Sequence, residues 1–288
     1  MKPLNIAITA AYSAFGDVAR NLRNIRKWTA RAKRKGAHIV AFPENMVQGQ
    51  FRETYKLAEP IPSGPSTQYL LALAREYRIY VSTGICEKAR GQNYVSNIIV
   101  GPEGLVSKYR KIHVCEYNCT NGTKTELVKI RGYMIGIQIC RDFAYPEPAR
   151  MLALDGADLI LHPAAFGVPP KGNDKGYIKP RDYFLPLCRS WENAVFYIHF
   201  NQAGDHVWNG RKIHFPGNIV AASPDEYEII RRKDKKNTER QMMATIDLNS
   251  SKTYQARKKG NYFINDRYPP LYKRLVQGKR VRRAQKGA

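Results

Sequence analysis

The chain has 288 residues, and 43% of them are hydrophobic, which is enough to build the core of a single α/β domain. No apolar run approaches the length of about 18 residues that a membrane span requires, so we expect a soluble protein. The formal net charge is +24, from 48 basic and 24 acidic residues, and an excess of this size favours acidic partners. The 5 cysteines lack the dense spacing of a disulfide scaffold, which favours a reduced protein of the cytoplasm.

Taken in chain order, the apolar and β-branched runs predict strands over residues 4–9, 38–42, 80–85, 96–100, 105–110, 134–140, 158–162, 195–200, 218–222 and 243–246. Apolar residues at helical spacing predict helices over 18–35, 66–77, 147–154 and 181–193. Strands and helices that alternate in this way require a sheet covered by helices. Because no linker rich in Gly, Ser or Pro divides the chain, we expect one domain over residues 1–272 and a basic tail over 273–288.

Three of the predicted strands end at an ionisable side chain. Glu44 follows one of them, Lys111 follows another, and Cys140 follows a third. The C-terminal edge of an open α/β sheet is where such folds usually place their chemistry. A lone cysteine in this position is more often a small buried hydrophobe, but a carboxylate, an ammonium and a thiol at three similar strand ends point to a shared site.

These three groups suit nucleophilic acyl transfer. A thiol is mostly protonated at neutral pH and needs a base, which Glu44 can provide. Attack by the thiolate creates an oxyanion that a fixed positive charge stabilises, and Lys111 can supply that charge. The sequence therefore predicts Cys140 as the nucleophile, Glu44 as its base and Lys111 as the oxyanion stabiliser.

The segments around these residues resemble the carbon–nitrogen hydrolase, or nitrilase, superfamily, whose catalytic set is Glu, Lys and Cys in this chain order. The matching segments cover nearly the whole chain and are 42–44, 109–113, 136–142, 145–147, 156–160, 189–197, 217–224, 262–263, 267–269 and Tyr272. The resemblance implies an α/β fold, a four-layer αββα sandwich of two mixed sheets with the active site at the strand ends. It also implies a cofactor-free hydrolase of a non-peptide C–N bond that forms homodimers or larger homo-oligomers.

The family often has a second glutamate between the lysine and the cysteine, which helps to position the lysine. Glu116 and Glu126 are the two candidates for this role. Glu116 precedes a loop that contains Asn121 and Gly122, as the family residue usually does, whereas Glu126 falls where the next strand should begin. Glu116 is therefore preferred.

Departures from the family pattern bear on the substrate. A Trp-Glu pair after the cysteine points to true nitrilases, and Arg141 and Asp142 stand there instead, which favours an amidase that releases ammonia from a small amide. Carbamoylases of amino acids have arginines where Phe143 and Ala144 stand in this chain. N-carbamoyl amines and nitriles remain alternative substrates, because the same catalytic groups serve them. The backbone N–H of Arg141 is expected to donate to the oxyanion beside Lys111.

Loop residues near the strand ends are the expected substrate-binding group. They are Tyr12, Val47, Phe143, Ala165, Phe166, Gly167 and Tyr183. His113, Cys115 and Cys119 have a His-x-Cys-x-x-x-Cys spacing that resembles a zinc half-site, but no second pair with the usual spacing follows, so no metal site is predicted. We expect His113 to pack beside Lys111 as a hydrogen-bonding core residue.

The charge excess supports a second, non-enzymatic hypothesis, a polyanion or nucleic-acid binding protein. Basic side chains on the predicted helix 18–35 are interpreted as its solvated face, because the apolar residues between them recur at helical spacing. The tail over 273–288 has no acidic residue and little apolar pattern, so we expect an arm that binds polyanions weakly. The sequence shows no helix-turn-helix, RNP, KH or zinc-finger pattern, and this favours the enzyme.

Overall fold

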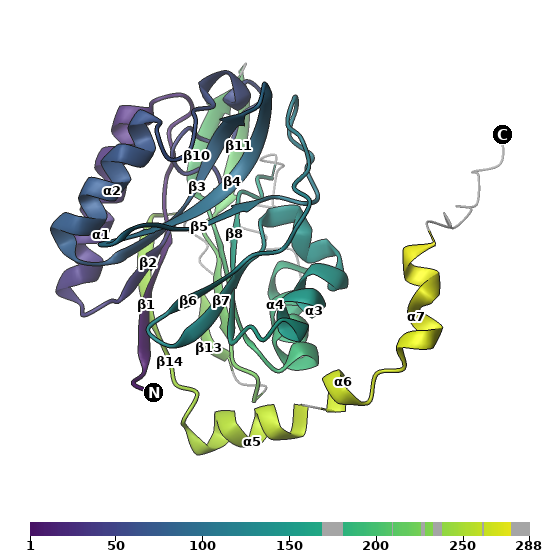
Figure 1. Ribbon diagram of the computed structural model, residues 1–288. Coiled ribbons are helices and arrows are strands. Elements are labelled where there is room, and N and C mark those ends of the chain that lie inside the picture. Colours follow the sequence, from purple (N-terminus) through teal and green to yellow (C-terminus); the bar gives the residue numbers. More distant parts are fainter. Residues whose placement is uncertain (169–180, 209, 226–227, 233–237, 261, 278–288) are drawn as a thin grey trace.

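The computed structural model describes residues 1–168, 181–208, 210–225, 228–232, 238–260 and 262–277, and two six-stranded sheets form its centre (Figure 1). The first sheet has the order β14 (Arg240–Ile246), β1 (Leu4–Ala10), β2 (Ile39–Ala41), β3 (Tyr80–Ala89), β4 (Gln92–Gly101) and β5 (Gly104–Arg110). The second has the order β13 (Glu228–Arg232), β12 (Ile219–Ala222), β9 (Phe196–Asn201), β8 (Leu159–Ala164), β7 (Tyr133–Ile137) and β6 (Leu127–Ile130). A separate hairpin consists of β10 (Ala203–Trp208) and β11 (Arg211–Pro216).

Both sheets are mixed. In the first sheet β1, β2 and β3 are parallel neighbours, and in the second β7, β8 and β9 are. The remaining pairings within the two sheets are antiparallel. The helices and 3-10 turns are α1 (Val18–Arg34), η1 (Thr54–Leu57), α2 (Pro65–Tyr77), η2 (Cys140–Ala144), α3 (Pro146–Leu154), α4 (Arg181–Asn193), α5 (Ser251–Gly260), α6 (Tyr262–Asn265) and α7 (Pro269–Val276).

The two sheets face each other across an apolar core, and helices cover their outer faces (Figure 1). Ile8 of β1 and Ile198 of β9 belong to the core between the sheets. Trp28 of α1 and Leu70 of α2 pack on the outer face of the first sheet, and Leu152 of α3 packs on that of the second. The four-layer αββα sandwich implied by the resemblance is therefore confirmed.

Most of the predicted elements are present, with ends that differ by a few residues. The prediction of a strand over 134–140 was wrong at its C-terminal end, because β7 stops at Ile137 and Cys140 opens the turn η2. Cys140 has φ +46°, a left-handed backbone conformation that a strand does not contain. The apolar segment at Phe196–Asn201 is explained by its place as β9 inside the second sheet, between β8 and β12. The hairpin, β13 and the helices after β14 were not predicted.

Of the helices that follow β14, α5 and α6 contact α4, and α7 stands apart from the sandwich (Figure 1). α7 crosses residue 272, the predicted boundary between domain and tail, and residues 278–288 of the tail lie outside the described residues. Leu271, Leu275 and Val276 of α7 are 67%, 69% and 86% exposed. Within the described ranges, no helix combines the length and the apolarity that crossing a membrane would take.

Candidate active site

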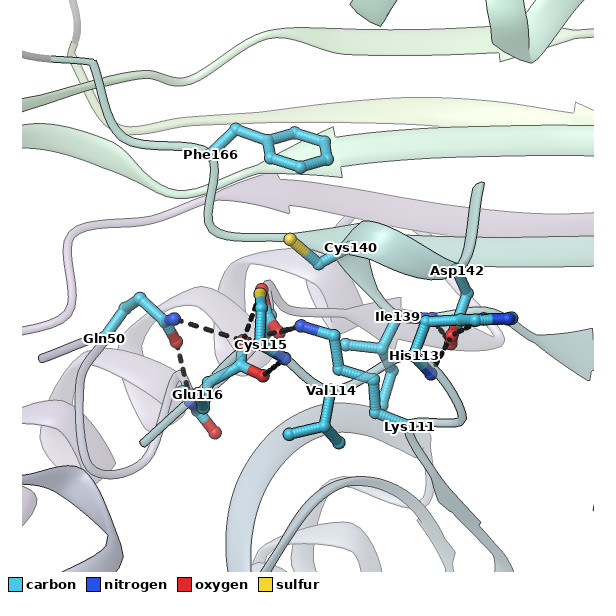
Figure 2. A network of polar contacts seen from close by, with 12 residues as sticks. Gln50, Lys111, His113, Val114, Cys115, Glu116, Ile139, Cys140, Asp142 and Phe166 are labelled. Carbon is cyan, nitrogen blue, oxygen red and sulfur yellow. Dashed lines mark hydrogen bonds and ion pairs between the residues drawn. The ribbon is translucent and has the colours of Figure 1, made fainter. Parts of the chain in front are cut away.

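The strand ends that carry Glu44, Lys111 and Cys140 meet at one edge of the sandwich. In the first sheet β2 is parallel to β3, and β5 is antiparallel to β4, which is itself antiparallel to β3. β2 and β5 therefore run in the same direction, so Glu44 and Lys111 emerge at the same edge. Cys140 follows β7 of the second sheet, and Figure 2 shows it beside the amino end of the Lys111 side chain.

The backbone at Glu44 is held against the first sheet by close packing. A Cβ at Gly84 of β3 would lie 2.2 Å from the backbone nitrogen of Asn45 and 2.7 Å from Cα of Glu44, so only glycine permits this approach. From the other side, Nε2 of Gln202 donates a hydrogen bond to the backbone oxygen of Glu44 at 2.8 Å. The Glu44 side chain itself is fully buried.

The amino group of Lys111 lies between two carboxylates (Figure 2). Its Nζ is 2.7 Å from Oε1 of Glu44 and 2.6 Å from Oε1 of Glu116, and the Lys111 and Glu44 side chains have no exposed surface. Burial alone would lower the pKa of Lys111, but its interactions with the acidic groups around it, the Cys140 thiol first and then the two glutamates, raise it well above its ordinary value. Lys111 therefore stays positively charged at neutral pH and is suited to stabilise an anion.

Of the two glutamates proposed for the second position, Glu116 is the one that contacts Lys111. Glu126 instead pairs with Lys124, at the start of β6. The loop that carries Glu116 folds back on the end of β5, where the backbone N–H of Gly122 donates to the oxygen of Lys111 at 2.7 Å. Burial alone would raise the pKa of Glu116, but Lys111 holds it below its ordinary value, so Glu116 is ionised at neutral pH.

Glu44 differs from Glu116 in its protonation. Burial raises the pKa of Glu44 to about 7, although the charge of Lys111 opposes the shift. A carboxyl with a pKa near neutral can both take and return a proton at physiological pH. The two carboxylates on Lys111 are thus differentiated by their surroundings, and Glu44 is the one suited to proton transfer.

Cys140 is 5% exposed and sits in the left-handed conformation at the first position of η2. Burial first, and then the charge of Glu44, raise the pKa of its thiol well above the ordinary value, while Lys111 and the backbone N–H of Ala165 lower it. The resting thiol is therefore protonated and needs a base before it can attack. In Figure 2 its sulfur lies near the ring of Phe166.

Asp142 ties the turn η2 to the adjoining strand ends. Its Oδ2 accepts hydrogen bonds from the backbone N–H of Ile139 at 2.9 Å and from the hydroxyl of Tyr109 at 2.7 Å. Its Oδ1 accepts from the backbone N–H of His113 at 2.8 Å, and Nδ1 of that ring lies 2.9 Å from the same oxygen. His113 is a hydrogen-bonding residue as expected, but it stacks on Tyr145 with 27% of its side chain exposed, so its placement in the core was wrong.

The segment with the His-x-Cys-x-x-x-Cys spacing does not bring its three side chains to a common point. Cys115 is next to the carboxylate of Glu116, with Sγ 3.7 Å from Oε1, and Cys119 contacts Cys86 instead. Among the described residues, no three His, Cys, Asp or Glu side chains are grouped as metal ligands would be.

The residues predicted to bind substrate lie in different places. The backbone N–H of Ala165 faces the Cys140 thiol, and Phe166 lies beside Cys140 in Figure 2. Phe143 is only 1% exposed and packs behind the turn, with its ring centroid 5.2 Å from that of Phe166. The guanidinium of Arg181 lies over the Phe166 ring, 4.9 Å from its centroid, and was not among the predicted residues.

Three further residues that were predicted to line the pocket pack against other parts of the fold. Val47 is fully buried in the core beneath α1, and Tyr183 is buried in the first turn of α4, edge-to-face with Phe184. Gly167 packs against Ile213 of the hairpin.

Tyr12 lies in a separate surface hollow. Its ring stacks on His206 with centroids 4.4 Å apart. With basic residues of α1 it lines a hollow of about 350 Å³, whose other lining residues are Arg20, Asn21, Arg23, Asn24, Lys27 and Glu239. The structure therefore associates Tyr12 with this hollow and not with the Glu44–Lys111 pair.

Two residues near Cys140 were missed by the sequence analysis. His162 of β8 and His199 of β9 are fully buried in the second sheet, and Nε2 of His162 lies 2.9 Å from the backbone oxygen of Cys140. A histidine inside an otherwise apolar strand was the available signal, because a buried polar side chain needs a hydrogen-bonding partner.

An αββα sandwich with a buried lysine, two glutamates and a thiol at one edge is the arrangement expected of a carbon–nitrogen hydrolase. Residues 5–256 match the family model described as carbon-nitrogen hydrolase. The chain belongs to the carbon–nitrogen hydrolase family.

Two curated relatives illustrate the range of this family. A protein of Pyrococcus abyssi named nitrilase is 33% identical over 256 residues, which cover 86% of this chain and 89% of the relative. The N-carbamoylputrescine amidase of Solanum lycopersicum is 27% identical, over 96% of this chain and 97% of the relative.

Solved structures with the same fold include a carbon–nitrogen hydrolase from Helicobacter pylori G27, with a TM-score of 0.82, 20% identity and coverage of 97% of this chain and 100% of the other. A mutant of the amidase from Nesterenkonia sp. AN1, solved with the acetamide moiety of fluoroacetamide added covalently at its active-site cysteine, gives a TM-score of 0.77 at 18% identity, over 94% and 96% of the two chains. At these identities the two structures support the fold alone.

Proposed function

We propose that this chain hydrolyses a small amide to an acid and ammonia through a thioester on Cys140. The observation that supports this most strongly is the Lys111 amino group, which is held by Glu44 and Glu116 at 2.7 and 2.6 Å beside the Cys140 thiol. A buried base, a permanent cation and a protonated thiol are the groups that acyl transfer through sulfur requires.

Acylation begins when Glu44 accepts the thiol proton and the thiolate attacks the amide carbon. The carbonyl π electrons move to oxygen, and the resulting oxyanion is stabilised by Lys111 and by the backbone N–H of Arg141. Glu44 then returns the proton to the amide nitrogen. The C–N bond breaks, ammonia departs, and the acyl group remains on Cys140.

Deacylation uses the same base. Glu44 takes a proton from water as the oxygen of that water attacks the thioester carbon, and Lys111 again stabilises the oxyanion. The C–S bond breaks, the acid leaves, and the proton held by Glu44 returns to the sulfur. Glu116, which stays ionised, keeps Lys111 in place throughout.

Nitriles and N-carbamoyl amines are the alternative substrates within this proposal. Relatives named nitrilase and N-carbamoylputrescine amidase support keeping both, because each would form an acyl-type adduct on the same sulfur. Ammonia release from short aliphatic amides, nitriles and N-carbamoyl compounds, measured with wild type and with Cys140→Ala, tests the proposal. Turnover of one class by wild type alone supports it, and equal turnover by Cys140→Ala contradicts it.

We also propose a weak affinity for polyanions, which the basic face of α1 supports. Five basic residues at helical spacing share this face, namely Arg20, Arg23, Lys27, Arg31 and Arg34. Contacts of the guanidinium of Arg20 with the Tyr12 ring and of Lys27 with the Trp28 ring, both at 5.3 Å, order two of these cations. The predicted basic tail falls mainly on residues outside the described ranges, so α1 carries this proposal.

Self-association is a further proposal, and the exposed apolar residues of α7 support it. Leu271 and Leu275 are one turn apart on a helix that stands away from the sandwich, and Trp191 of α4 is also 43% exposed. A second copy of the chain would bury such surface. Light scattering of wild type and of Leu271→Ser/Leu275→Ser tests this: the proposal expects a dimer or larger assembly that the double variant weakens, and a monomeric wild type contradicts it.

A further inference from the structure

A chain of buried hydrogen bonds connects the backbone of Cys140 to the loop at Phe166. Nε2 of His162 lies 2.9 Å from the backbone oxygen of Cys140, and the two Nδ1 atoms of His162 and His199 are 3.0 Å apart. Nε2 of His199 lies 3.0 Å from Nδ2 of Asn218. These contacts join β8, β9 and the residue before β12 behind the turn η2.

This series of buried hydrogen bonds ends at the loop after β8. Nδ2 of Asn201 donates to Oδ1 of Asn218 at 3.2 Å and to the backbone oxygen of Phe166 at 3.1 Å. Oδ1 of Asn201 accepts from the backbone N–H of Phe166 at 2.9 Å. All four side chains, those of His162, His199, Asn201 and Asn218, are buried.

The direction of every hydrogen bond in this chain follows from its first acceptor. A backbone oxygen only accepts, so Nε2 of His162 carries the proton and, in a neutral ring, its Nδ1 is an acceptor. His199 must then donate from Nδ1, which leaves its Nε2 to accept from the amide of Asn218. That orientation presents Oδ1 of Asn218 to Asn201, and the two asparagines are consistent with it.

Both rings are neutral at physiological pH. Burial lowers the pKa of His162 to about 4 and that of His199 well below its ordinary value. A proton added to His162 would place two donors face to face between the Nδ1 atoms, and one added to His199 would place two donors face to face between its Nε2 and Nδ2 of Asn218. The neutral state of both rings is therefore the one that this geometry requires.

We propose that His162 and His199, continued by Asn218 and Asn201, are positioning residues that aim the oxyanion-binding N–H of Arg141. The proposal rests on the proposed function of Cys140. Because a peptide unit is planar and trans, the oxygen of Cys140 and the N–H of Arg141 point in opposite directions within one rigid group. A hydrogen bond that fixes the oxygen therefore fixes the N–H as well.

The same series of hydrogen bonds fixes the position of the loop at Phe166, on the other side of the nucleophile. Asn201 holds both backbone polar groups of Phe166, and the N–H of the preceding residue, Ala165, faces the Cys140 thiol. The left-handed conformation of Cys140 is strained for a residue with a side chain and persists only where its surroundings hold it. One buried network thus fixes the turn η2 and the loop at Phe166 relative to each other.

Three variants test the proposal through kcat and KM on the substrate found in the ammonia screen. His162→Leu removes the donor to Cys140, and we expect kcat to fall about 10- to 100-fold with KM changed less than about threefold. His162→Gln can donate from its amide to the same oxygen and should restore kcat to within about fivefold of wild type. Tyr197→Phe removes a buried hydrogen bond to Gln138 in the same sheet, 2.7 Å long, and should leave kcat unchanged.

Wild-type kcat in His162→Leu, with Cys140 still acylated, would overturn the positioning role and leave the proposed function intact. A fall in Tyr197→Phe equal to that in His162→Leu would also overturn it, because general loosening of the sheet would then explain both.

The tautomers provide a test that needs no substrate and no variant. Long-range ¹H–¹⁵N correlation spectra of the wild-type protein should show His162 protonated at Nε2 and His199 at Nδ1. His162 protonated at Nδ1 would contradict the network whether or not Cys140 is a nucleophile, whereas failure to acylate Cys140 would refute only the proposed function.

Discussion

Replacing Lys111 with methionine removes the positive charge between two buried carboxylates and keeps a side chain of similar length. Glu44 and Glu116 then lose the cation that contacts them at 2.7 and 2.6 Å in a site without exposed lysine surface. Removing one partner of a buried ion pair costs about 3–5 kcal/mol, because the remaining charge is uncompensated. Burial raises the pKa of Glu44, and the loss of Lys111, which opposes that shift, raises it further. We therefore expect the free energy of unfolding to fall by that amount only well above neutral pH, where both carboxylates would be ionised.

Urea unfolding, followed by far-UV circular dichroism, measures this loss. Lys108→Met is the matched control, since Lys108 pairs with Glu87 at the same distance of 2.7 Å but is 30% exposed, and Glu87 keeps its contact with Arg110. The control should cost about 0–1 kcal/mol. Adding Glu44→Gln to Lys111→Met should recover part of the loss. Equal losses for the two lysine variants, with no recovery in the double variant, would refute the buried charge cluster.

Because the pKa of Glu44 is raised to about 7, kcat/KM should rise with pH through about 7 as the Glu44 carboxyl becomes a base. Glu44→Gln should abolish this rise and lower the rate about 10²–10⁴-fold, and a pH–rate series on both proteins checks this. Stability changes in the opposite sense. The stabilising contribution of a carboxyl with a raised pKa is complete at a pH below the ordinary pKa of that carboxyl and is lost as pH rises through about 7. The urea midpoint of Glu44→Gln should therefore be less sensitive to pH in that range than the midpoint of wild type. Gly84→Ala places a Cβ 2.2 Å from the neighbouring backbone nitrogen, so it should displace the Glu44 loop and lower kcat at least tenfold or prevent folding; an active, stable variant would show that the close approach is unnecessary. Deleting residues 278–288 should leave amide turnover unchanged, whereas Arg23→Glu with Lys27→Glu should weaken binding to single-stranded DNA and flatten its salt dependence in a filter-binding assay.

The positions of Glu44, Lys111 and Cys140 at strand ends could be predicted because buried strands have a clear apolar pattern and the polar residue that ends each one stands out. That the three residues meet at one edge depends on the direction of the strands that carry them. The alternation of strands and helices in the sequence also indicates this direction. The choice of Glu116 over Glu126 depended on a loop signal, and the structure agrees in placing Glu116 on Lys111.

The remaining features depend on contacts between distant segments. Tyr12 follows a strand that leads toward the site, yet its ring stacks on His206. His206 lies in a hairpin that the sequence pattern did not predict. The left-handed turn at Cys140 cannot be derived from an apolar run, since the run itself continues to Ile139. His162 and His199 pair only because β8 and β9 are in register, with these two residues opposite each other.

The measurement that tests the central claim most directly is intact-protein mass spectrometry of the enzyme quenched during turnover, followed by peptide mapping. The account predicts an added mass equal to the acyl group of the substrate, located on Cys140 and absent from Cys140→Ala, with Glu44→Gln altering how much of it accumulates. An acyl adduct on Cys86, Cys115, Cys119 or Cys188, or steady turnover by Cys140→Ala, would contradict it.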